Sequence, residues 1–159
     1  MRDPILNKFQ LNTGMWMKLK LIGLIILTSF FSLLIFIDGS ALSSEIQWHA
    51  YDDGMARSKF EKKKIFLHFT ADWCFYCGVM ENEAFKDPAI ISSLNENFVS
   101  IKVDYDKETE TANFYRVQGL PDSIFIAEDG QIIGRRPGYI PLAQLKLILD
   151  VVLSQRSQE

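Results

Sequence analysis

The chain has 159 residues, of which 48% are hydrophobic and 23% are charged, and its net charge is −3. This composition is typical of a globular protein and excludes a disordered or fibrous chain. Without the four basic and two acidic residues of positions 1–41, residues 42–159 carry 13 Lys and Arg against 18 Asp and Glu, a net charge of −5. An acidic domain without a basic stripe lacks the electrostatic footprint of nucleic-acid binding, and we exclude that class.

The N-terminal segment has the pattern of an export or membrane signal. Residues 21–37 form an uncharged run of 17 residues. Four basic residues precede it: Arg2, Lys8, Lys18 and Lys20. The run is longer than the apolar part of a usual signal peptide and only just reaches the shortest span of a bilayer. Its length alone therefore leaves two interpretations open, and both keep the basic flank in the cytoplasm.

Small residues after the apolar run favour cleavage without excluding an anchor. They have the spacing that a signal peptidase reads, either Gly39 with Ala41 or Ala41 with Ser43. We predict that residues 1–41 are a signal peptide or an N-terminal membrane anchor and that residues 42–159 are one exported domain. The domain is expected to be periplasmic or otherwise extracytoplasmic, soluble after cleavage or anchored by residues 21–37.

The first elements of this domain are predicted to be a helix and a buried strand. Asp52 and Asp53 are expected to cap the helix, with Ala56 and Phe60 on one face. Residues 65–69 are almost continuously apolar, as in a strand that is covered on both faces. This strand should be central in its sheet.

A helix with an apolar stripe should follow, beginning near Cys74. The stripe consists of Cys77, Met80, Ala84 and Phe85. A second helical piece is predicted from Pro88 to about Asn95, and a strand over residues 98–104, where apolar and polar residues alternate.

The last third of the chain reads as a helix, a hairpin and a final helix. The predicted segments are a helix over 107–117, a break at 119–121, strands over 124–126 and 132–134 joined at Asp129-Gly130, and a helix opened by Pro141. This order of βαβ units followed by ββα predicts an α/β fold with a mixed central sheet sandwiched by helices.

The two cysteines of the chain, Cys74 and Cys77, stand in one Cys-x-x-Cys. A disulfide closing so short a loop contributes little stability through loop entropy, so the pair is expected to serve chemistry or binding. At the first turn of a helix, free backbone N–H groups and the helix dipole favour a thiolate. Cys74 is therefore predicted to be the attacking nucleophile and Cys77 the shielded, resolving thiol.

Two other interpretations of the pair are open. Soft thiolates suit copper and zinc, so the chain could be a metal-binding module or carrier. Zinc needs four ligands, however, and the other candidates, His49 and His68, have no finger-like spacing, so a zinc site would require a dimer sharing two pairs. Alternatively, the cysteines could be incidental to an apolar contact patch formed by Trp73, Phe75 and Tyr76.

With these residues in view, positions 46–153 resemble the thioredoxin-like family. The run Ala71-Asp72-Trp73-Cys74-Phe75-Tyr76-Cys77 is similar to the active-site motif of the family, and Gly119-Leu120-Pro121 is similar to its second signature. Within the family, the chain looks most like the periplasmic C-terminal domain of the transmembrane disulfide reductase DsbD and small exported thioredoxin-fold proteins. The resemblance implies a thioredoxin fold, with a mixed central sheet of four to five strands flanked by helices on both faces.

The resemblance also implies roles for residues around the cysteines. Pro121 would be cis and face the disulfide, Leu120 would offer backbone hydrogen bonds to a substrate peptide, and Trp73 would line the site. Phe75 and Tyr76 complete the candidate substrate-binding residues. The expected function is disulfide exchange with exported proteins, as a reductase supplied by a membrane electron donor, with the disulfide as the redox centre and neither another cofactor nor a metal.

Three positions depart from the family pattern. His68 stands where many members have a buried carboxylate that assists proton transfer from the resolving thiol. Its imidazole could serve as that base, or it could be a core histidine satisfied by hydrogen bonds. Asp122 follows the proline where Thr is common, and its charge would disfavour a thiolate unless it points to solvent. The dipeptide Phe75-Tyr76 matches none of the best-known intervening pairs.

Overall fold

The structure is a computed structural model that describes residues 18, 20, 22, 23 and 44–155. Contacts divide the chain into two units, residues 1–41 and 42–159, and the sheet and its helices belong to the second. Within the described ranges, none of the helices has the length and apolar character needed to cross a membrane. The predicted signal peptide or anchor lies almost wholly outside those ranges and stays a prediction.

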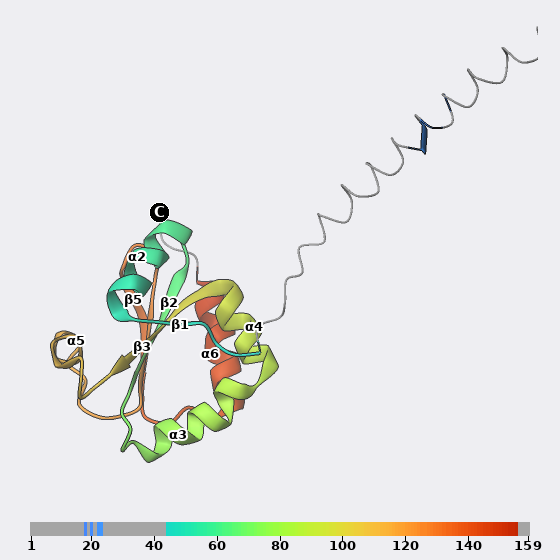
Figure 1. The fold of residues 1–159 in the computed structure, drawn as a ribbon. Helices are drawn as coiled ribbons and strands as arrows, with labels where there is room; N and C mark the ends of the chain where they lie inside the picture. The colour runs from blue at the N-terminus through green and yellow to red at the C-terminus, as the bar shows by residue number, and fades with distance from the viewer. Residues whose placement is uncertain (1–17, 19, 21, 24–43, 156–159) are drawn as a thin grey trace, which may run out of the picture. The chain divides into compact units, whose positions relative to one another are not determined.

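A five-stranded mixed sheet forms the centre of the domain (Figure 1). Its strands are β1 (Trp48–His49), β2 (Lys64–Thr70), β3 (Phe98–Asp104), β4 (Asp122–Ile126) and β5 (Ile132–Pro137). They lie in the order β1-β3-β2-β4-β5. β1 and β2 run parallel to β3, whereas β4 is antiparallel to both β2 and β5. The predicted mixed sheet and the central position of the strand over 65–69 are confirmed.

Five α-helices and one 3₁₀ helix pack around this sheet in the described part of the chain. They are α2 (Tyr51–Glu61), α3 (Phe75–Asn82), the 3₁₀ helix η1 (Ala84–Lys86), α4 (Pro88–Asn97), α5 (Thr109–Phe114) and α6 (Leu142–Ser154). α4 begins where predicted, because the Asp87 carboxylate caps it by accepting hydrogen bonds from the backbone N–H groups of Ala89 and Ile90. α5 is shorter than the predicted helix over 107–117.

The helix that begins after Cys74 also ends earlier than its apolar stripe suggests. α3 stops at Asn82, and Ala84 and Phe85 belong to η1. Both residues are buried nevertheless, so the stripe correctly identified the core-facing side of a segment that changes helix type.

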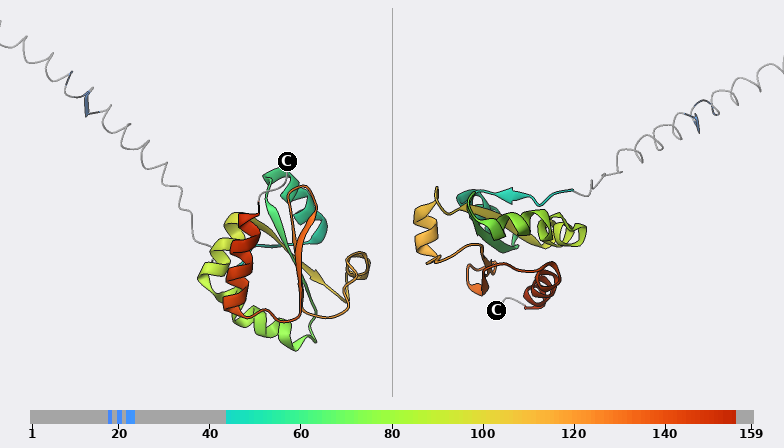
Figure 2. Two further views of the ribbon diagram at one scale, coloured as in Figure 1. Left: turned by 180° about the vertical axis from the view of Figure 1, so that it is seen from behind. Right: turned by 90° about the horizontal axis from the view of Figure 1, so that it is seen from below.

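Each face of the sheet carries its own apolar core. On one face, Phe66 and Phe125 pack with Leu94 of α4 and Leu145 of α6. The two helices lie side by side in Figure 1 and in the left view of Figure 2. On the other face, β2 and β3 residues pack with Ala112 of α5 and with α2. Alternate residues of β2 serve the two cores, which confirms helices on both faces.

The predicted orientation of α2 is wrong. Asp52 and Asp53 lie in the first turn of the helix instead of capping it, and the N-cap is Ala50. Ala56 is exposed, and the side chain of Phe60 is 89% exposed. The apolar pair therefore lies on the solvent side of the helix.

Small residues form the buried face of α2. Gly54 and Ser58 are its buried positions, and a Cβ atom at Gly54 would lie 2.4 Å from Ile101 Cγ1 and 2.6 Å from Cδ1. A helix that approaches β3 so closely can present no larger side chain there. The close approach of the α2 backbone to Ile101 decided the orientation of the helix, and hydrophobic periodicity carries no information about such an approach.

We expect Gly54→Ala to destabilise the domain although alanine favours helices. Overpacking against Ile101 should lower the free energy of unfolding by about 1–3 kcal/mol. We expect this loss to exceed the gain of roughly 1 kcal/mol that alanine brings through its higher helix propensity. Urea unfolding of the oxidised protein measures the difference. Gly78→Ala is the matched control, because Gly78 is also helical but a Cβ atom added there would meet no neighbour within 4 Å. That variant should be more stable than wild type, and equal effects of the two substitutions would contradict the close approach.

Candidate active site

Cys74 and Cys77 form a disulfide at the start of α3, and Cys74 stands four residues after the end of β2. The sulfur atoms are 2.06 Å apart and the Cα atoms 5.3 Å apart. Cys74 is the N-cap residue of α3, and Cys77 lies within its first turn. Cys74 is 8% exposed and Cys77 is 1% exposed, so the first cysteine is the more accessible of the two.

Backbone N–H groups at the helix start are directed at Cys74. The N–H of Cys77 donates to Cys74 Sγ at 3.2 Å and also lies 3.1 Å from the Cys74 carbonyl oxygen. The N–H of Gly78 donates to the same carbonyl at 3.2 Å. In the reduced pair, the N–H of Cys77 and the positive end of the helix dipole stabilise negative charge on the sulfur of Cys74. The geometry thus makes the two sulfur atoms chemically unequal.

The loop before β4 packs against the disulfide. Leu120 and Tyr105 are partly buried against Ala71, Cys74 and Cys77. The peptide bond between Leu120 and Pro121 is cis, and Pro121 is buried. Two segments far apart in the sequence therefore meet at the cysteines.

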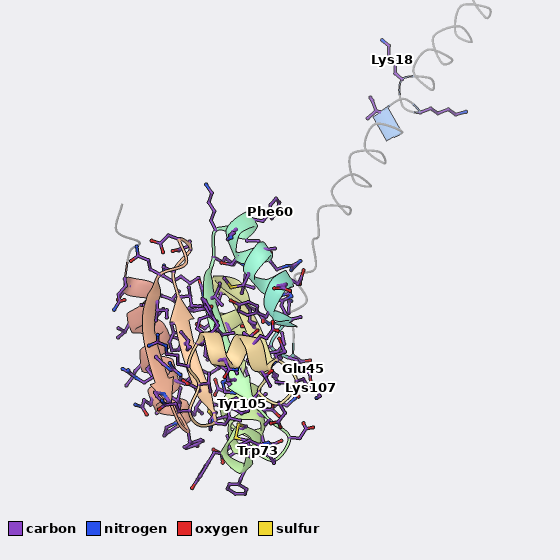
Figure 3. All side chains as sticks on the ribbon, turned by 90° about the vertical axis from the view of Figure 1, so that its left-hand side faces the viewer. Lys18, Glu45, Phe60, Trp73, Tyr105 and Lys107 are labelled. Carbon is purple, nitrogen blue, oxygen red and sulfur yellow. A yellow bond between two sulfur atoms is a disulfide. The ribbon has the colours of Figure 1, made fainter. Side chains whose placement is uncertain are left out.

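Exposed aromatic side chains surround the more accessible sulfur. Trp73, Phe75 and Tyr76 are all exposed. The indole N–H of Trp73 donates to Asp106 Oδ2 at 2.8 Å, which orients its ring. Figure 3 shows Trp73 at the same end of the domain as Tyr105, opposite Phe60. The three aromatic residues offer an apolar surface next to the disulfide.

A polar cleft lies on the other side of the pair, and its charged residues were not singled out from the sequence. Both cysteines line it together with Asp72, Glu81 and Lys102. Lys102 Nζ is 2.9 Å from Glu81 Oε1 and 4.8 Å from the centre of the Trp48 ring. Glu81 stands four residues after Cys77, and this spacing was the one sequence signal that could have placed both residues on the same face of the helix.

His68 is buried beneath the site in an environment that keeps it neutral. The side chain is fully buried, and Nδ1 is 3.0 Å from Ser123 Oγ, whereas Nε2 has no hydrogen-bond partner among the described residues. Burial, and secondly the charge of Lys102, lower its pKa from 6.5 to about 3. An imidazole with so low a pKa has little tendency to accept a proton from a thiol. This environment favours the interpretation of His68 as a core histidine.

Asp122 does not place an unpaired charge at the cysteines. It is 1% exposed, so it does not point to solvent, and its carboxylate pairs with Arg135. Arg135 Nε lies 3.2 Å from Oδ1 and 3.0 Å from Oδ2. Successive β4 residues face opposite sides, so Ser123 meets His68 while Asp122 faces the side of α5. Asp122 is therefore buried, but its charge is compensated by the partly exposed Arg135.

The histidines do not join the cysteines in a metal site. His49 Nδ1 lies 3.3 Å from Asp53 Oδ2, and His68 is occupied by Ser123. Over the ranges that the structure covers, no three His, Cys, Asp or Glu residues are grouped in a way that could hold a metal ion. The described geometry offers no support for the metal-carrier alternative.

Comparison with known proteins agrees with this arrangement. The family model described as a thioredoxin-like domain matches residues 51–153. The chain belongs to the thioredoxin-like family.

Individual relatives and one solved structure each match more than half of the chain. An uncharacterized protein of Caenorhabditis elegans is 31% identical over 55% of this chain and 13% of its own length. The disulfide bond reductase DsbH of Chlamydia pneumoniae is 26% identical over 58% of this chain and 63% of its own length. This chain therefore spans less than two thirds of both relatives. The solution structure of a thioredoxin from Thermus thermophilus is 27% identical, covers 69% of this chain and 88% of that one, and has a TM-score of 0.64.

We expect His68 to make the domain sensitive to acid. The folded state binds a proton on this side chain only near pH 3, whereas the unfolded state binds one near pH 6.5. The contribution of neutral His68 to the free energy of unfolding is therefore fully present above pH 6.5. It falls by about 1.4 kcal/mol per pH unit as the pH drops from 6.5 toward 3. Urea unfolding of wild type and His68→Gln between pH 7 and pH 4 measures the effect. The two curves of stability against pH should diverge below pH 6.5, and parallel curves would contradict the shifted pKa.

Proposed function

We propose that this protein is a thiol–disulfide oxidoreductase that exchanges disulfides with other proteins through Cys74 and Cys77. The observation that carries the proposal is the position of Cys74 Sγ at the N-cap of α3, where it accepts the N–H of Cys77. Membership of the thioredoxin-like family supports the same chemistry. The greater exposure of Cys74, 8% against 1% for Cys77, supports attack by the first cysteine and resolution by the second.

The reaction transfers two electrons from the reduced pair to a client disulfide. The Cys74 thiolate attacks one client sulfur, the client S–S bond breaks, and the departing client sulfur takes up a proton. The thiolate of Cys77 then attacks Cys74 in the mixed disulfide. This step closes the Cys74–Cys77 bond, releases the second client thiol and returns the enzyme to its oxidised form. An electron donor must reduce the pair before the next turnover.

The surface beside Cys74 suits an extended client segment. Exposed Phe75, Tyr76 and Trp73 offer apolar contact area, and the Leu120–Pro121 loop lies against the disulfide. We propose that the client lies along this loop as an added strand, held by the backbone of Leu120. Side chains of the aromatic residues would then contact the positions next to the client cysteine.

We further propose that the domain works outside the cytoplasm and in the reducing direction. Export is supported by the uncharged run at residues 21–37 after a basic flank. Direction is supported by the similarity to the reductase DsbH. A reductase in an oxidising compartment requires a continuous electron supply, for which a membrane donor is the expected source.

Substitution of the two cysteines should separate their roles. Cys74→Ser removes the nucleophile, so kcat/KM for reduction of a disulfide-bonded polypeptide should fall by at least about two orders of magnitude. Cys77→Ser leaves attack intact but blocks resolution, so mixed disulfides with clients should accumulate. Reductant-free gel electrophoresis after alkylation detects these adducts. Turnover that survives Cys74→Ser unchanged, or adducts that form on Cys77 in that variant instead, would refute the assignment.

The redox state of the pair in cells tests the proposed direction and compartment together. Cells of the source organism are quenched with acid, alkylated with a reagent that adds mass to free thiols, and fractionated. We expect the protein in the extracytoplasmic fraction with its pair mostly reduced, because the donor replaces electrons faster than the compartment removes them. A pair that is mostly oxidised there would point to an oxidase instead.

A further inference from the structure

The guanidinium group of Arg135 joins three segments of the domain. From β5, it donates through Nε and Nη2 to the carboxylate of Asp122, the first residue of β4. It also donates through Nη1 to the carbonyl of Tyr115 at 2.8 Å and through Nη2 to the carbonyl of Arg116 at 3.2 Å. The last two acceptors follow the end of α5. A single side chain thus ties the end of α5 to the start of β4.

The segment between these anchor points is the loop that faces the disulfide. Residues 117–121 run from the two carbonyls held by Arg135 to the residue before Asp122. Within this loop, Leu120 packs against the cysteine pair and Pro121 is buried. Arg135 therefore binds the chain immediately before and immediately after the loop, and its hydrogen bonds go to these two anchor points and not to the cysteines.

The chemistry of the anchor requires arginine and a buried carboxylate. A guanidinium is planar and presents several N–H donors in fixed directions, so it can bind a carboxylate and two carbonyl oxygens at once, whereas a lysine ammonium is a compact point charge. Asp122 is 1% exposed and depends on this partner for compensation of its charge. Arg116 adopts a left-handed backbone conformation, with φ of 51°, which its bound carbonyl helps to hold.

We propose that Arg135 is a positioning residue that holds the loop over residues 117–121 at the distance from Cys74 that a client strand requires. The proposal rests on the proposed function, because it assigns the loop to client binding. Arg135 acts through the loop and not on the reacting sulfur atoms. Loosening it should therefore weaken the binding of an extended client while leaving the intrinsic reactivity of the cysteine pair unchanged.

Arg135→Lys tests this proposal, with Arg136→Lys as its matched control. Arg136 is the next residue of β5, is exposed, and donates through Nη1 to the backbone carbonyl of Arg135. Four quantities are measured on each reduced variant. They are KM and kcat with insulin as a disulfide-bonded polypeptide, the rate with the small disulfide 5,5′-dithiobis(2-nitrobenzoic acid), and the equilibrium of the pair with glutathione.

For Arg135→Lys, KM for insulin should rise by about five- to tenfold, because a mobile loop must be ordered when the client binds. Its kcat, its rate with the small disulfide and its equilibrium with glutathione should stay within about twofold of wild type. Arg136→Lys should match wild type in every measurement. A folded Arg135→Lys protein with unchanged KM, or one that loses its rate with the small disulfide to the same extent, would overturn the positioning role.

Asp122→Asn provides a second variant should Arg135→Lys fail to fold. The substitution keeps the side-chain volume and leaves the hydrogen bonds from Arg135 to the carbonyls of Tyr115 and Arg116 in place. It weakens only the contact between Arg135 and the first residue of β4. We expect a smaller rise in KM with the same unchanged rate toward the small disulfide, and an unchanged KM would overturn the proposal. Wild-type protein that does not reduce insulin at all would instead refute the proposed function.

Discussion

The structure depends on one constraint, which is that the central strand β2 fixes where the chain turns into α3. β2 is buried on both faces and pairs with strands on both sides, so its end has one fixed position in the domain. Residues 71–74 connect that end to α3, whose first backbone N–H groups have no partners within the helix. Cys74 is the last of these residues and the N-cap of the helix. The asymmetry between the two sulfur atoms follows from the place where a rigid strand stops.

Polar and charged side chains are buried on both faces of β4. Ser123 meets neutral His68 on one face, and Asp122 pairs with Arg135 on the other. Burial of an unpaired charge costs more than a pair contributes, so the Asp122 carboxylate is tied to Arg135, while His68 is tied through Nδ1 to Ser123. One member of each pair, Asp122 or Ser123, follows Pro121 within two residues. The loop that faces the disulfide is thus held by specific contacts, whereas apolar packing alone would tolerate small displacements.

Several elements could be predicted from the sequence because their signals are local. The strand β3 was predicted with its observed bounds, since apolar and polar residues alternate along it, and Pro88 marked the start of α4. The two-residue strand β1 escaped prediction, because so short a segment has no periodicity. The orientation of α2 was predicted wrongly, because its contact with β3 depends on the absence of a side chain at Gly54.

The sequence by itself determined the cysteine pair, the family and the order of the helices and strands other than β1, since each of these depends on residue types at short spacing. Only the tertiary structure decided what surrounds the pair. His68 and Ser123 are 55 residues apart in the chain, and Asp122 and Arg135 belong to different strands. Whether a buried imidazole is neutral, or a carboxylate is compensated, depends on which distant groups the sheet brings within hydrogen-bond distance. Spacing along the chain carries no record of those distances.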